Sequence, residues 1–111
     1  MIIESEKVED VLLGREMKMT VSIDPIDGKT MNDYNFKVEV FARGKAVVYE
    51  KGDMKRIDDS NYSMVVDTRK VGTGRMKVVV TAYIPDTDSE DMVREEPVLL
   101  DPKVNIIDIK R

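Results

Sequence analysis

Apolar side chains recur at every second position along most of this chain, and that period of two is the feature that most constrains its fold. The longest example spans residues 76–84, where one face is made of Met76, Val78, Val80, Ala82 and Ile84. Successive side chains of a strand point to opposite faces of a sheet, so this alternation is typical of strands. No segment shows a helical apolar stripe of useful length. The pattern therefore predicts an all-β fold.

Shorter segments with the same alternation predict further strands at 17–23, 36–42, 46–50, 62–66 and 104–109. Turn-forming residues separate them at 25–28, 43–45, 51–53, 58–61 and 72–74. We expect about seven strands in two antiparallel sheets that pack face to face, as in an immunoglobulin-like sandwich. The chain has no Cys and no Trp, so the disulfide and buried Trp of antibody domains are missing and the label describes architecture only. A small barrel is the alternative, because strand spacing does not decide between open and closed sheets.

The chain has 111 residues, which suits a single domain over 1–111. Two segments fit the strand pattern poorly. Residues 1–13 carry apolar side chains that need burial, and they form either an N-terminal arm or the first strand. Residues 85–102 begin and end with Pro, and the eleven residues after Pro85 hold six acidic side chains against the single Arg94. We expect a long acidic loop there, and a loop of this length usually binds something.

Charge is distributed unevenly along the chain. Residues 1–42 carry five basic and nine acidic side chains, a net charge of −4; residues 43–77 carry nine basic and five acidic, a net of +4; and residues 78–111 carry four basic and eight acidic, a net of −4. A mixed solvated surface explains this distribution, and so does contact between the acidic end of one copy and the basic middle of the next. Carboxylates interrupt the basic middle, which disfavours nucleic acid as a partner.

The sequence offers little for catalysis. His and Cys are absent, which removes the usual general base and the strongest side-chain nucleophile. Gly72 and Gly74 lack the Gly-Lys-Ser/Thr sequence and the helix of a phosphate-binding loop. The acidic residues 86–91 lack the Gly and the flanking helices of a calcium loop. We therefore expect no enzyme activity, no cofactor and no metal.

Location and membrane contact follow from two further observations. No apolar run approaches the roughly 20 residues that cross a bilayer, so we expect no membrane contact. The N-terminal residues MIIESEKVED are acidic, whereas a signal peptide begins with basic residues. The sequence thus predicts a protein made in the cytoplasm.

A partner interface is expected in the acidic segment. We predict that the 85–102 loop packs on a neighbouring subunit in a homo-oligomer, because its charges complement the basic middle of the chain. Two methionines in charged surroundings are further candidates for this contact, since they are hard to bury within one copy. The predicted interface residues are Asp86, Asp88, Glu90, Asp91, Met92, Arg94 and Met54.

The order of short motifs carries a resemblance. KGD at 51–53, then YSMVVDTRKVGTGRMKVVVTAYIPD at 62–86, then an acidic stretch with Arg94 and Glu95, resembles small β-sandwich domains of tailed-bacteriophage virions. It is similar to the N-terminal sandwich of upper-baseplate and tail-fibre proteins and to small head or tail proteins, over roughly residues 15–109. The resemblance implies a structural virion protein, made in the host bacterial cytoplasm, that self-associates and docks other virion proteins. It implies no active-site residues.

Two other classes of function stay open at this point. A carbohydrate- or surface-binding sandwich module is the main alternative, although a chain with four Tyr and no Trp offers few aromatic residues for sugar stacking. A small enzyme that uses only carboxylates, Lys or Tyr is the other.

Overall fold

The chain folds almost entirely into strands. The computed structural model describes residues 8–43, 46–88 and 92–108. Within them lie one short α-helix, α1 (Thr68–Val71), and one 3-10 turn, η1 (Lys51–Asp53). The strands are β1 (Glu9–Leu12), β2 (Glu16–Ser22), β3 (Asn35–Phe41), β4 (Val47–Glu50), β5 (Lys55–Asp58), β6 (Asn61–Asp67), β7 (Gly74–Arg75), β8 (Lys77–Pro85), β9 (Val93–Leu100) and β10 (Val104–Ile107).

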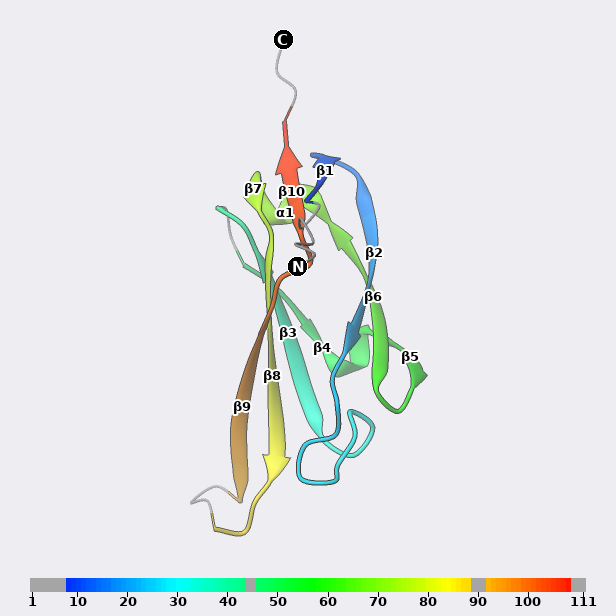
Figure 1. Cartoon of the computed structure of the whole chain (residues 1–111), viewed down its shortest axis with the longest axis vertical. Helices are drawn as coiled ribbons and strands as arrows, with labels where there is room; N and C mark the ends of the chain where they lie inside the picture. The colour runs from blue at the N-terminus through cyan, green and yellow to red at the C-terminus, as the bar shows by residue number, and fades with distance from the viewer. Residues whose placement is uncertain (1–7, 44–45, 89–91, 109–111) are drawn as a thin grey trace, which may run out of the picture.

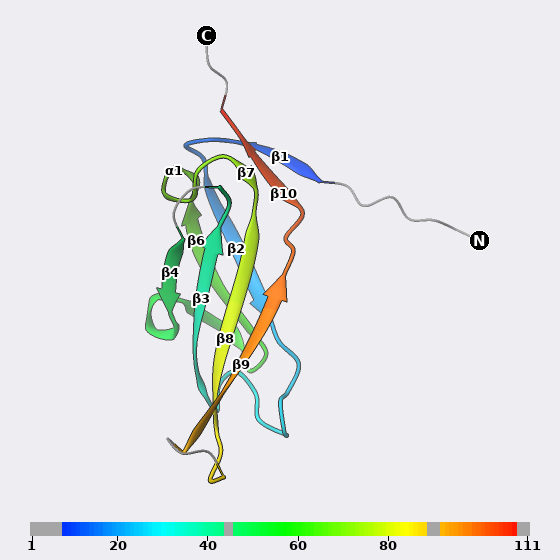
Figure 2. The same cartoon turned by 90° about the vertical axis from the view of Figure 1, so that its left-hand side faces the viewer.

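Two sheets form the body of the molecule. One has the strand order β2-β6-β5 and the other β4-β3-β8-β9, and they lie against each other in Figures 1 and 2. All pairs within them are antiparallel. This division of strands is that of an immunoglobulin-like sandwich with one added edge strand, here β4. The all-β, sandwich-like fold predicted from the sequence is confirmed, and none of the sheets in the described residues closes into a barrel.

A third, smaller sheet lies at one end and has the order β1-β10-β7. Its β1–β10 pair is parallel, with Glu9 beside Val104, so the expectation of purely antiparallel sheets is wrong at this pair. The two strands connect through the whole chain rather than through a hairpin, and parallel pairing needs such a long connection. Residues 9–12 are thus a strand; residues 1–7 lie outside the described part.

The prediction of a long acidic loop over 85–102 is wrong. Its second half forms β9, which pairs with β8 from Pro85–Val93 to Val78–Leu100, so the connection between them spans only 86–92. Pro97 lies within β9, and Pro is tolerated there because β9 is the edge strand of its sheet. The expected count of about seven strands is also too low, because β5, β7 and β9 lack a visible apolar alternation.

The core lies between the two larger sheets and is built by the predicted alternation. The inward side chains Val78, Val80 and Ala82 of β8 are buried, and so are Phe36, Val38 and Val40 of β3 opposite them. Met64 and Val66 of β6 close the core from the other sheet. Burial of each such side chain stabilises the fold by roughly 1.5–3 kcal/mol.

Gly at a positive φ marks two of the expected turns, whereas residues 44–45 of the expected 43–45 turn lie outside the described part. The turn at 25–28 is closed by a bridge between Ile26 and Lys29, with Gly28 at a φ of 77°. Gly74 has a φ of 117°, and a Cβ there would lie 3.1 Å from Cγ of Arg43. The chain therefore needs Gly at position 74, where it leaves α1 and enters the long β7–β8 segment. Among the described residues no helix is long and apolar enough to cross a membrane.

A single lysine ties the loop before β3 to the body. Nζ of Lys51 donates to the carbonyl oxygens of Tyr34 at 2.8 Å and Asn32 at 3.3 Å. It also lies over the rings of Phe36 and Tyr62, 5.7 and 5.8 Å from their centroids. Burial lowers the pKa of Lys51, but two carbonyl dipoles and two ring faces favour its charged form.

Replacement of this lysine tests its contribution to stability. Lys51→Met keeps the apolar stem but leaves two carbonyl groups without their charged donor, so we expect the free energy of unfolding to fall by about 2 kcal/mol. Urea denaturation measures the change. Lys55→Met, at an exposed position in β5, is the matched control and should change it by less than about 0.5 kcal/mol. Equal effects of both substitutions would contradict the role given to Lys51.

Candidate interaction surface

The outer face of the β4-β3-β8-β9 sheet carries a strip of apolar side chains. The register places Val48, Glu39, Val79 and Leu99 in one row across the four strands, and residues directly opposite each other share a face. Leu99 is 67% exposed and Val48 48% exposed. Pro97 and Val93 extend the strip along β9. Figure 2 looks toward this sheet, with β4 and β9 at its two edges.

Two charged side chains in the middle of this face pair with each other. Lys37 and Glu39 form an ion pair at 3.8 Å in the middle of the sheet. The pKa of Lys37 is raised, first by the hydroxyl of Tyr83 on the neighbouring strand and then by Glu39. Mutual pairing lowers the cost of covering these charges with another surface. The face can therefore be buried without leaving an isolated charge at its centre.

A broad pocket hollows the same face near the β8–β9 connection. Its volume is about 610 Å³, and its lining combines Tyr34, Tyr83, Pro85 and Val93 with the polar side chains of Asp33, Asn35 and Glu95. The register places Asn35, Tyr83 and Glu95 in one row. The pKa of Asp33 is lowered, chiefly by the backbone N–H of Thr30, so a carboxylate stays ionised at the rim of this pocket.

Arg94 neutralises much of the acidic segment from within the chain. Its guanidinium contacts Asp27 at 2.6 Å, Glu96 at 2.7 Å and Asp86 at 3.4 Å. The pKa of Arg94 is raised, first by the Asp27 bond. These contacts join β9 to the 25–28 turn and to the start of the 86–92 connection. Of the acidic side chains in 86–96 that the structure describes, Asp86 and Glu96 thus have an internal partner.

The structure places the predicted interface residues in different surroundings. Asp86 and Arg94 are joined in the Arg94 cluster, and Asp86 also accepts the backbone N–H of Asp88. Asp88 is exposed, and Met92 is 57% exposed. Met54 lies far from them in the sequence and is partly buried against the core. Glu90 and Asp91 lie outside the described residues.

Sequence reasoning missed the residues that make the apolar strip. Val48 lies in the short strand VVYE and Leu99 at the end of the acidic strand VREEPVLL, and their shared row appears only once the register of four strands is known. The one available signal was the outer face of the 76–84 segment, where Val79, Thr81 and Tyr83 are less polar than a solvated face usually is.

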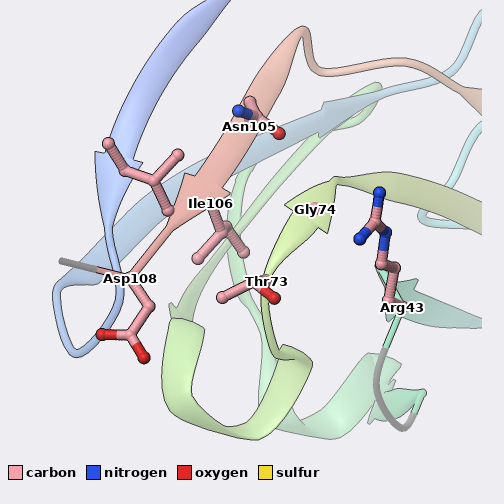
Figure 3. A pocket seen from close by; sticks show the side chains of 7 residues that line it. Arg43, Thr73, Gly74, Asn105, Ile106 and Asp108 are labelled. Atoms are coloured by element: carbon pink, nitrogen blue, oxygen red, sulfur yellow. The ribbon is translucent and has the colours of Figure 1, made fainter. Parts of the chain in front are cut away.

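Another pocket lies at the end of the molecule that carries the small sheet. It has a volume of about 400 Å³, and Figure 3 shows Arg43 and Asp108 on opposite sides of it, with Thr73 and Ile106 between them. Its charges do not converge on a common point. Among the described residues, no group of three or more carboxylates is arranged to hold a metal ion.

The Arg94 cluster makes a prediction about local opening. Arg94→Ala should speed amide hydrogen exchange in the 25–28 turn and at 86–88, because both lose their tie to β9. Arg94→Lys should restore only part of the protection, since an ammonium does not reproduce the planar fork that meets three carboxylates. Arg69→Ala, an exposed site on α1, is the control. Unchanged hydrogen exchange in Arg94→Ala would contradict the proposed role of the Arg94 cluster.

Comparison of the chain with family models, with curated proteins and with solved structures gave no match. The resemblance to phage virion domains therefore stays a prediction, and a function has to be argued from the residues and the geometry of this chain.

Proposed function

We propose that the protein is a non-enzymatic structural protein of a tailed-bacteriophage virion that docks neighbouring subunits through the outer face of its β4-β3-β8-β9 sheet. The observation that carries the proposal is the apolar surface of that face, where the exposed Leu99 lies beside the half-buried Val79, with the exposed Val48 beyond Glu39 in the same row. Contiguous exposed apolar surface on a soluble protein marks an interaction site more often than a scattered single residue does.

The energetics favour the face over the edge of the sheet as the contact. Cover over Leu99 alone contributes roughly 1.5–3 kcal/mol. The β9 edge, by contrast, carries Glu95, Glu96 and Pro97, and charged residues and Pro on an edge strand discourage strand addition. A neighbour therefore gains most by packing across the sheet. The acidic 86–92 connection lies at the rim of this contact and favours a basic neighbour.

Self-association is the simplest form of this docking. A face that contains both apolar residues and mutually paired charges can pack on a second copy around a two-fold axis. The same surface can receive other virion proteins, and the resemblance of residues 51–95 to phage virion domains supports such a role in a tail, baseplate or head accessory protein. On this proposal the chain is made in the host bacterial cytoplasm and resides in the virion.

Substitution of Leu99 tests the proposed contact. Leu99→Lys places a charge where an apolar side chain would be covered, so we expect the dissociation constant of the oligomer to rise at least about tenfold. Sedimentation velocity over a concentration series measures it. Ile57→Lys, at a comparably exposed site on β5, is the matched control and should leave association unchanged. A wild-type chain that stays monomeric at high concentration would count against self-association.

The pocket at Tyr83 favours a second candidate function, carbohydrate binding. An aromatic ring beside carboxylate and amide side chains, as with Tyr83, Asn35 and Glu95, is chemistry that suits a sugar ring. If this candidate is right, a glycan screen should yield a ligand whose binding Tyr83→Ala abolishes and Val48→Ala preserves. Absence of binding to every glycan in the screen would remove it.

A further inference from the structure

A stretch of sheet edge lacks a partner on the side of the molecule opposite β9. β5 pairs with β6 only at residues 61–63, whereas β2 pairs with β6 along its whole length. Residues 64–67 of β6 therefore have a strand neighbour on one side alone. β4, the nearest strand of the other sheet, is itself an edge strand. Figure 1 shows β5 and β9 at opposite sides of the sandwich.

A groove of about 440 Å³ occupies this position. Tyr49 of β4, Met64 and Val65 of β6 supply its apolar lining, and Lys18, Lys55, Asp53 and Ser63 its polar lining. Val65 is 55% exposed, and the register places it opposite Lys18 on the outer face of β2-β6-β5. The groove thus offers one apolar contact between two ammonium groups.

On the side that faces the groove, the backbone of β6 beyond Ser63 has no strand partner among the described residues. The N–H of Thr68 donates to the carbonyl oxygen of Arg15 at 3.4 Å, next to β2, so the backbone groups of Thr68 point toward β2 and those of Asp67 point away from it. Backbone groups alternate sides along a strand, which directs the N–H and C=O of Val65 to the same side as those of Asp67. They lie where β5 would pair if it began earlier. An added strand could accept from and donate to Val65 there.

The charges of the groove select the kind of strand. Lys18 and Lys55 form no ion pair among the described residues. Asp53 is engaged, since its carboxylate accepts the N–H of Glu50 at 3.0 Å. Lysines beside an unpaired sheet edge discourage the addition of most strands, and of basic strands in particular. The same lysines attract a strand that carries carboxylates beside an apolar side chain.

We infer that this groove is a docking site for an extended peptide segment of a partner protein that carries an apolar residue with an acidic residue two positions away on either side, so that all three side chains lie on the face of Val65. The segment adds as a short strand along residues 64–67 of β6. Its apolar side chain packs on Val65, and its carboxylates pair with Lys18 and Lys55. The site is separate from the sheet face proposed for self-association, and neither depends on the other.

The test uses the full chain and two peptides of equal length, which we call the Glu peptide, Thr-Glu-Thr-Val-Thr-Glu-Thr, and the Lys peptide, Thr-Lys-Thr-Val-Thr-Lys-Thr. By fluorescence anisotropy, the Glu peptide should bind at least about tenfold more tightly, and its binding should weaken as salt is raised. Titration followed by amide NMR should shift Val65, Tyr49 and Asp67 first. Equal affinity for the two peptides, or shifts confined to the outer face of β8 and β9, would overturn the inference.

Charge-reversal variants sharpen the result. Lys18→Glu with Lys55→Glu should weaken the Glu peptide at least tenfold and favour the Lys peptide, while Arg43→Glu with Lys70→Glu makes the same change in net charge elsewhere and should not. A circular dichroism melt shows whether each variant folds. If the Lys18 and Lys55 double variant does not fold, Val65→Glu is tested in its place. Loss of self-association in the Lys18 and Lys55 variant without any peptide binding would identify a second copy as the occupant and overturn the proposal.

Discussion

The structure depends on the pairing of β8 along both of its edges. It bonds to β3 on one side and to β9 on the other over nearly its full length. Its side chains alternate between the core and the outer face of the sheet. Val78, Val80, Ala82 and Ile84 point inward and are buried. Val79, Thr81 and Tyr83 point outward and are half-buried. A strand that is held on both edges has a fixed register, so each of its faces is presented in one way only.

The core and several turns were predictable because the physics that forms them is local. In β8 and β3, burial on one face imposes an alternation that the sequence shows directly, and the 25–28 turn is marked by Pro and Gly. β9 was not predictable, because its residues VREEPVLL read as a polar loop. Tertiary context overrode that tendency: the free edge of β8 supplies a ladder, and an edge position tolerates both Glu and Pro.

The candidate site was predictable only in part, for a related reason. The acidic residues near 86–96 stand out in the sequence, but their internal pairing with Arg94 depends on the place of Asp27, which lies in a distant turn. The apolar strip depends on the register across four strands, so the placement of Val48 and Leu99 in one row becomes visible only in the folded structure. A run of charges is visible in the sequence itself, whereas a docking surface depends on where the fold places each residue.

The two sides of the sandwich differ in charge and polarity. On one side, Glu95, Glu96 and Pro97 occupy an edge strand whose backbone is poorly suited to accept another strand, while the adjacent sheet face carries exposed apolar side chains beside a charged pair. On the other, Lys18 and Lys55 flank a short run of free backbone at Val65. Free backbone groups give affinity to any strand, so selectivity has to come from the side chains around them. On the two proposals above, an acidic strand suited to Lys18 and Lys55 is disfavoured at the β9 edge by Glu95 and Glu96, so the two sides select different partners.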